Sequence, residues 1–279
     1  MKRLILKAPA KINLGLNIIS KREDGFHNLE TIFYPVEDLY DVLTFEEAGE
    51  FSLVTEKSVN ISQENNLITK AKRMLEEYSN ETLRVKITLK KNIPVGGGLG
   101  GGSSDAARTL LGLNEFFDLK IPKRELYKIA LELGSDVPFF LLARPAFAES
   151  RGEVLLSLNF SISFPILLIN PGIHISTKEA FQNIKPKEEH IDYLQISSLQ
   201  ENEMVKLNSL LKNDFEPYVF ERYPEVAKIK NELLTAGAFF ALMSGTGSTV
   251  YGIFEDLESA KSAKEKFASD YFSFLQLPE

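Results

Sequence analysis

The stretch PVGGGLGGGSSDAA, residues 94–107, is the most informative part of the sequence. Six of residues 96–102 are glycine, and the run lies between an alternating strand pattern at 85–89 and a helical pattern with Ser103 or Ser104 as its N-cap. A backbone without Cβ atoms can curve around an anion, and the following helix adds its positive N-terminal end. The stretch therefore predicts a phosphate-binding loop. The alternative is a flexible surface linker, although Pro94 and Leu99 are not typical of linkers.

The common nucleotide-binding motifs do not account for this loop. Gly96, Gly98 and Gly101 satisfy G-x-G-x-x-G, but a run so rich in glycine matches by chance, and the chain continues into another helix where a Rossmann unit needs a strand. The sequence contains no G-x-x-x-x-G-K-[ST], no H-R-D and no D-F-G. These absences exclude a Walker A protein and a protein kinase.

Composition sets the broad class of the protein. Of its 279 residues, 44% are hydrophobic and 25% charged, which excludes disordered and low-complexity classes. A net charge of −7 speaks against non-specific nucleic-acid binding, and the absence of cysteine excludes disulfides, zinc–thiolate sites and cysteine nucleophiles. Neither a signal peptide nor a membrane span is recognisable. We expect a cytoplasmic monomer or homodimer that binds neither nucleic acid nor membranes.

Periodicity predicts a mixed order of strands and helices, which favours an α+β fold. Residues 11–18 alternate as a half-buried strand, with Ile12 and Leu14 on one face and Lys11 and Asn13 on the other. Helices are predicted over 67–78, over 126–133 up to Gly134, over 226–233, and over 257–268. Strands at 239–243 and 249–254 enclose the turn SGTGS. An apolar stretch at 155–170 predicts a domain boundary, with an N-terminal domain at 1–157 that contains the glycine-rich loop and a C-terminal domain at 158–279.

Three segments in order resemble the motifs of the GHMP kinases, which are small-molecule ATP-dependent kinases. They are KAPAKINLGL at 7–16, PVGGGLGGGSSDAA at 94–107 and LMSGTGSTVYG at 242–252. The resemblance implies a two-domain GHMP kinase fold, with an N-terminal ribosomal protein S5 domain 2-like part and a ferredoxin-like C-terminal part. ATP is the implied co-substrate, with Mg²⁺ carried on its phosphates and no protein residue singled out as a metal ligand.

Further segments resemble one branch of that family. DGFH at 24–27, LETIF at 29–33 and GSDVPFF at 134–140 are similar to kinases that phosphorylate the 2-hydroxyl of a cytidine diphosphate derivative of methylerythritol, in non-mevalonate isoprenoid synthesis. That branch more often has tyrosine where this chain has Phe26. The alternatives are another acceptor, such as homoserine or a mevalonate-type compound, and a non-enzymatic nucleotide-binding protein.

The resemblance implies a catalytic pair, Lys11 and Asp136. A positioned carboxylate can take the proton of an alcohol, and an ammonium can offset charge on the transferring phosphoryl group. The structural alternatives are a helix N-cap for Asp136, which precedes Pro138, and a solvated strand lysine for Lys11.

The same resemblance implies binding residues. His27 can donate and accept hydrogen bonds at a cytosine edge, and two phenylalanines, Phe33 and Phe181, match an aromatic slot for the pyrimidine. For Thr177 the alternative is the N-cap of a helix at 178–183, and for Ser244–Ser248, expected on the phosphate side, it is a plain β-turn. The expected substrate residues are Asn13, His27, Phe33, Thr177 and Phe181. The expected nucleotide residues are Asn66, Leu67, Pro94, Val95, Gly96, Gly97, Gly98, Leu99, Gly100, Gly101, Gly102, Ser103 and Ser104.

Overall fold

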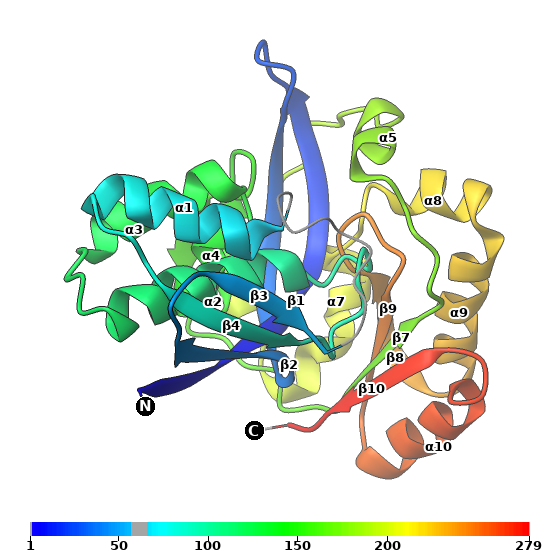
Figure 1. Ribbon diagram of the computed structural model, residues 1–279. Coiled ribbons are helices and arrows are strands. Elements are labelled where there is room, and N and C mark those ends of the chain that lie inside the picture. Colours follow the sequence, from blue (N-terminus) through cyan, green and yellow to red (C-terminus); the bar gives the residue numbers. More distant parts are fainter. Residues whose placement is uncertain (1, 57–65, 279) are drawn as a thin grey trace. The chain divides into compact units, whose positions relative to one another are not determined.

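The computed structural model describes residues 2–56 and 66–278 (Figure 1). Its chain divides into two compact units. Unit 1 comprises Met1–Ala10, Val36–Val95 and Gly100–Ala143, and unit 2 comprises Lys11–Pro35, Gly96–Leu99 and Arg144–Glu279. The first two strands, β1 (Arg3–Lys21) and β2 (His27–Glu47), each contribute residues to both units. The units are therefore interleaved along the chain, and the sequence-based boundary between residues 157 and 158 stays a prediction.

The described part of unit 1 combines part of a six-stranded sheet with four helices. The short strand β3 (Ser52–Thr55) runs parallel to β4 (Val85–Lys90), and β4 pairs antiparallel with the second half of β2, from Val42 to Glu47. The helices are α1 (Leu67–Ser79), α2 (Gly101–Phe116), α3 (Lys123–Leu133) and α4 (Val137–Leu142). They pack on one another, α1 and α4 both against α2.

Unit 2 contains two antiparallel strand sets. The first half of β2 pairs with β5 (Ala146–Glu149), which pairs with β6 (Val154–Ser157). A separate four-stranded sheet has the order β10 (Phe272–Gln276), β7 (Ile166–Asn170), β9 (Val250–Phe254) and β8 (Ala238–Met243).

Six helices and a 3₁₀ turn complete the described part of unit 2. They are α5 (Thr177–Gln182), α6 (Tyr193–Ser197), the 3₁₀ turn η2 (Glu201–Lys206), α7 (Leu207–Leu210), α8 (Glu216–Arg222), α9 (Pro224–Thr235) and α10 (Leu257–Phe267). Figure 1 shows α8, α9 and α10 on one side of the four-stranded sheet. The apolar faces of α9 and α10, including Ile229 and Phe267, pack against it and bury Phe254. No helix in residues 2–56 and 66–278 is long and apolar enough to cross a membrane.

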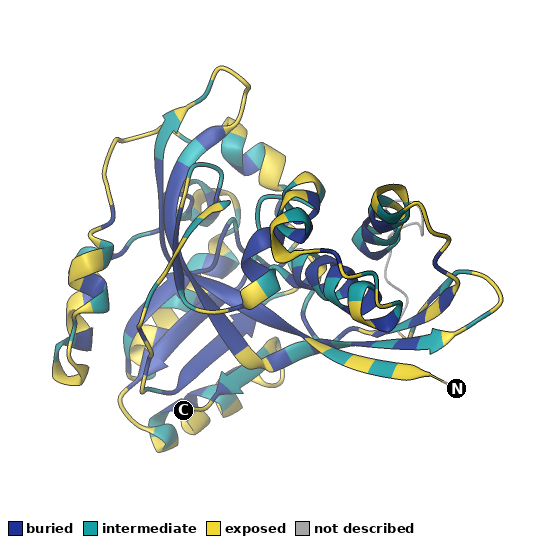
Figure 2. Cartoon of the chain, turned by 90° about the vertical axis from the view of Figure 1, so that its left-hand side faces the viewer, coloured by how far each residue is buried: buried dark blue, intermediate teal, exposed yellow. Residues whose placement is uncertain are grey.

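Strand β1 corrects one sequence expectation. The alternation at 11–18 predicted a half-buried strand, but every residue from Ala8 to Ile18 is buried, as the change of colour along β1 in Figure 2 shows. The polar face is buried because its side chains find partners inside the protein: Asn13 bonds to Thr31, and Asn17 donates to the carbonyl of Glu189. An alternating pattern shows that the two faces of a strand differ, but it does not show that the polar face contacts water.

Most predicted helices and strands are confirmed, and the start of α2 is the main exception. The helices predicted at 67–78, 126–133 and 257–268 correspond to α1, α3 and α10. The predicted N-cap, Ser103 or Ser104, is wrong because α2 begins at Gly101 after Gly100, which has φ +70° and makes no side-chain cap. Left-handed backbone is inexpensive only for glycine, so the glycine run itself forms the helix start.

Candidate active site

Two glycine-rich loops meet the middle of β1 within unit 2. The backbone N–H of Lys11 donates to the carbonyl of Leu99 at 3.0 Å. The N–H of Asn13 donates to Ser244 Oγ at 3.2 Å, and Ser244 Oγ donates to the carbonyl of Gly98 at 2.9 Å. Residues 146 apart in the sequence, Gly98 and Ser244, are thereby joined beside the strand that carries Lys11. The turn at 244–248 connects β8 to β9 and also packs on the first loop, so it is more than a plain turn.

Contact between the loops requires glycine. A Cβ added to Gly98, which has φ +77°, would lie 2.1 Å from the carbonyl oxygen of Ser244, and one added to Gly97 would lie 2.5 Å from Asn170 Nδ2. Gly96 is covered by an imidazole, since its added Cβ would lie 2.7 Å from His174 Nδ1. Gly96–Leu99 is thus a close-packed part of unit 2, which argues against the linker alternative.

Lys11 lies in a polar network on the buried face of β1. Its Nζ donates to Asn13 Oδ1 and lies 5.2 Å from the centroid of the Phe33 ring. Asn13 Nδ2 donates to Thr31 Oγ1 at 2.9 Å, and Thr31 Oγ1 donates to the carbonyl of Gly15. Lys11 is 4% exposed, so the solvated strand lysine of the structural alternative is wrong. Thr31 was not singled out from the sequence, although it lies in the LETIF segment.

His27 packs against one end of a small aromatic cluster in the same unit. The ring centroids of His27 and Phe181 lie 5.2 Å apart. Phe181 packs edge-on against Phe215, with 4.9 Å between the ring centroids. Burial, with a smaller contribution from the charge of Lys21, lowers the pKa of His27. Near neutral pH the imidazole is therefore uncharged, with one nitrogen donating and the other accepting, as recognition of a base edge requires.

Thr177 is the first residue of α5, and its alternative role as N-cap is wrong. Ser176 occupies that position and accepts a hydrogen bond from the N–H of Glu179. Thr177 Oγ1 instead lies 3.3 Å from Thr246 Oγ1, so α5 begins beside the second glycine loop.

The first turn of α2, in unit 1, has the features of an anion site. Gly102 is exposed, and a Cβ added there would meet only Leu67 Cδ1, at 3.9 Å, so the space beside it is open. Ser104 is fully buried, and its Oγ has no hydrogen-bond partner among the described residues. Open space, an unpartnered hydroxyl and the positive end of a 16-residue helix fit a phosphate group. Asn66 caps α1 by accepting from the N–H of Ile68 at 2.9 Å, which places Leu67 in the first turn of α1.

Asp136 occupies the N-cap position of α4 but does not cap it. Its backbone is helical, with φ −81° and ψ −16°, and its side chain makes no capping hydrogen bond. The capping alternative is therefore wrong, because a capping side chain needs an extended backbone at that residue. Pro138 lies in the first turn, as expected.

A buried charge cluster in unit 1 was not predicted. Lys91 Nζ donates to Asp41 Oδ2 and, at 2.9 Å, to Asp105 Oδ2, while Asp41 Oδ1 accepts from the N–H groups of Asn92 and Ile93. Burial raises the pKa of Asp105 to about 7; the charge of Lys91 opposes this shift, and the charge of Asp41 adds to it. The cluster fixes the backbone immediately before Pro94 and the second turn of α2, on both sides of the glycine-rich run.

Sequence comparison decides the family. The family model "GHMP kinases N terminal domain" matches residues 66–144, and "GHMP kinases C terminal" matches residues 195–273. The 4-diphosphocytidyl-2-C-methyl-D-erythritol kinase of Chlorobium phaeobacteroides (strain BS1) is 43% identical over 275 residues, covering 97% of this chain and 96% of that protein. The chain belongs to the GHMP kinase family.

A second relative and two solved structures agree in sequence or in fold. The protein named 4-diphosphocytidyl-2-C-methyl-D-erythritol kinase in Citrifermentans bemidjiense is 41% identical over 96% of this chain and 95% of that protein. A crystal structure of 4-(cytidine 5'-diphospho)-2C-methyl-D-erythritol kinase superposes with a TM-score of 0.83 at 32% identity, covering 98% of each chain. Homoserine kinase from Cytophaga hutchinsonii, at 17% identity and a TM-score of 0.73 over 100% of this chain and 95% of that one, shares the fold. The two-domain α+β GHMP kinase fold is thus confirmed, and membership of a kinase family implies ATP as co-substrate.

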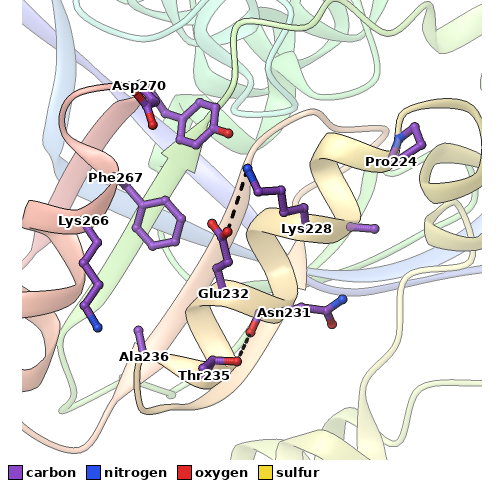
Figure 3. Close-up of a pocket in the computed structure, with 11 residues that line it drawn as sticks. Pro224, Lys228, Asn231, Glu232, Thr235, Ala236, Lys266, Phe267 and Asp270 are labelled. Carbon is purple, nitrogen blue, oxygen red and sulfur yellow. Dashed lines mark hydrogen bonds and ion pairs between the residues drawn. The ribbon is translucent and has the colours of Figure 1, made fainter.

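This GHMP kinase also has a pocket that contains none of the predicted site residues. It measures about 690 Å³ and is lined mainly by α9 and by the end of α10 (Figure 3). On its wall, Lys228 Nζ lies 3.9 Å from Glu232 Oε1. Lys266 and Asp270 contribute one positive and one negative charge. No glycine loop and no cluster of unpaired charge of one sign lines it, so its walls do not resemble a phosphate site.

Proposed function

We propose that this protein transfers the γ-phosphoryl group of ATP to the 2-hydroxyl of 4-diphosphocytidyl-2-C-methyl-D-erythritol, in the methylerythritol phosphate route to isoprenoid precursors. The observation that carries the proposal is the 43% identity over 97% of the chain to a protein bearing that kinase's name. The hydrogen bonds from the backbone N–H groups of Lys11 and Asn13 to the two glycine-rich loops support it, because they hold the strand that carries the Lys11 ammonium against those loops. A cytoplasmic location is part of the proposal.

Lys11 and Asp136 are the proposed catalytic residues. Asp136 takes the proton of the 2-hydroxyl as its oxygen attacks the γ-phosphorus; the new O–P bond forms, the bond to the bridging oxygen breaks, and ADP leaves. Lys11 offsets negative charge in the transition state. Because Asn13 and the Phe33 ring hold the Lys11 ammonium, little reorganisation is needed when that charge develops.

His27, Phe181 and Phe33 are the proposed cytidine residues. The lowered pKa keeps the His27 imidazole neutral, and the neighbouring Phe181 ring offers a face for stacking on the pyrimidine. Such stacking contributes roughly 1–3 kcal/mol per base. Thr177, beside Thr246, and Asn13 complete the proposed substrate contacts.

The nucleotide is assigned to residues 94–104 together with Asn66 and Leu67. Gly102 and the buried Ser104 hydroxyl provide the open, polar first turn of α2. Mg²⁺, when bound with ATP, neutralises charge on the phosphates. Within residues 2–56 and 66–278 no group of three His, Asp or Glu side chains is arranged to hold a metal, so the ion would be carried on the ATP phosphates.

ADP release tests the proposal. The purified protein is given Mg-ATP with one acceptor at a time: the diphosphocytidyl compound, homoserine, mevalonate or galactose. We expect acceptor-dependent ADP only with the first compound. Turnover with any other acceptor and none with the first would refute the assignment. ATP binding without turnover on any acceptor would favour the non-enzymatic alternative.

A further inference from the structure

The side chain of Asn213 forms a hydrogen bond to the second glycine-rich loop, residues 244–248. It lies in the short segment between α7 and α8 and is 2% exposed. Its Nδ2 donates to the carbonyls of Met243 and Gly245, at 2.8 and 2.7 Å, and its Oδ1 accepts from the N–H of Phe215 at 2.9 Å. A buried amide that donates to one carbonyl at the end of β8 and to another in the loop is a fixed support, because leaving either carbonyl unpaired would be costly.

The segment that carries Asn213 is itself fixed to β1. The N–H of Leu16 donates to the carbonyl of Lys212 at 2.8 Å, and the N–H of Asp214 donates to the carbonyl of Leu16 at 2.9 Å. Asp214 Oδ2 also accepts from the N–H of Ile18 at 2.8 Å. Asn213 thus connects the second glycine loop to the same strand that carries Lys11.

The bond to Gly245 sets the direction of one peptide group. In a trans peptide the carbonyl and the following N–H point in opposite directions, so a Gly245 carbonyl held by Asn213 directs the Thr246 N–H away from Asn213. No residue of the described chain accepts a hydrogen bond from that N–H. Gly245 has φ +59°, and a glycine can rotate the peptide into another orientation at little cost.

We propose that Asn213 is a positioning residue for phosphoryl transfer: it locks the Gly245–Thr246 peptide so that the Thr246 N–H is presented to a phosphate oxygen of the nucleotide. This proposal rests on the proposed kinase function. Main-chain N–H groups stabilise developing charge only when they are oriented beforehand. Asn213 supplies that orientation without touching the nucleotide.

Asn213→Asp is the first test, with Asn208→Asp as its matched control. The variant keeps the shape of the side chain and replaces two donors by a carboxylate that repels the Met243 and Gly245 carbonyls. Asn208 Nδ2 also donates to two carbonyls, those of Val205 and Phe239, but it is exposed and does not contact the loop. We expect Asn213→Asp to lower kcat/KM for ATP by about 10²-fold, the effect of a misplacement near 1 Å, while KM for the acceptor stays within about twofold. Asn208→Asp should match the wild type.

Two further measurements keep the test decisive. Asn213→Ser, which is uncharged and retains one donor, replaces Asn213→Asp if the latter does not fold, and it should show a smaller loss of the same kind. In folded Asn213→Asp, kcat/KM for ATP should recover as the pH is lowered, because a protonated carboxyl can donate to one carbonyl.

A folded Asn213 variant with wild-type kcat/KM for ATP, or equal losses in the Asn208 control, would overturn the proposal. Affinity for Mg-ATP alone, measured by calorimetry, needs no acceptor. It therefore separates failure of this proposal from failure of the acceptor assignment.

Discussion

Replacing Gly98 by alanine tests the contact between the two glycine loops. The added Cβ would lie 2.1 Å from the Ser244 carbonyl oxygen and 3.1 Å from that of Gly247, and both are backbone atoms that cannot rotate away. The φ of +77° adds strain, because a left-handed backbone costs a residue with a side chain about 1–2 kcal/mol. Overpacking of a filled site costs about 1–3 kcal/mol more. The total expected loss of unfolding free energy for Gly98→Ala is about 2–5 kcal/mol.

Gly172→Ala is the matched control for that variant. Gly172 has a similar φ of +73°, but nothing lies within 4 Å of its added Cβ. Gly172→Ala should therefore lose only about 1–2 kcal/mol of unfolding free energy, the cost of backbone strain. Urea unfolding of both variants gives the difference, and KM for ATP reports the displaced loop. Equal stability losses in the two variants would refute the close contact between Gly98 and Ser244.

Other predictions concern single groups of the proposed mechanism. Asp136→Asn should bind ATP as the wild type does and lose at least about 10²-fold in kcat, the low end for a general base; wild-type kcat would remove Asp136 from the mechanism. His27→Ala should weaken cytidine binding and leave ATP affinity unchanged in calorimetry, whereas equal losses of both would indicate misfolding. Because burial raises the pKa of Asp105 to about 7 from its ordinary 3.8, the native state holds a proton that the unfolded state releases, so wild-type stability should fall as pH rises from about 4 to 7. Asp105→Asn should remove that part of the slope in urea melts across this range, and an unchanged slope would show that Asp105 is not the titrating group.

Local patterns were sufficient for elements whose environment is set by nearby residues. Helix α1 follows from its apolar spacing, and α3 ends where Gly134 predicts. The composition of the glycine-rich run was enough to predict a phosphate-binding loop, and that role stays a prediction. The family resemblance added Lys11, Asp136 and His27 as candidate site residues, which periodicity could not have distinguished from a strand lysine, a helix cap and a turn histidine.

Long-range contacts lay beyond local reasoning. The bond between Ser244 and Gly98 joins residues 146 apart, and no local pattern encodes such a pairing. Burial of the polar face of β1 depends on Thr31 and on the carbonyl of Glu189, which come from another strand and from a distant loop. Asn213 itself carries no sequence signal, because a buried amide and an exposed one look alike until the fold supplies the two carbonyls.

The most direct test of the central claim is phosphorus NMR of the product formed from Mg-ATP and 4-diphosphocytidyl-2-C-methyl-D-erythritol. The account predicts that ADP appears together with one new phosphomonoester on the 2-oxygen, while the diphosphate linkage to cytidine stays intact. ATP hydrolysis to inorganic phosphate without a new phosphomonoester, or a phosphoryl group on another hydroxyl, would contradict it.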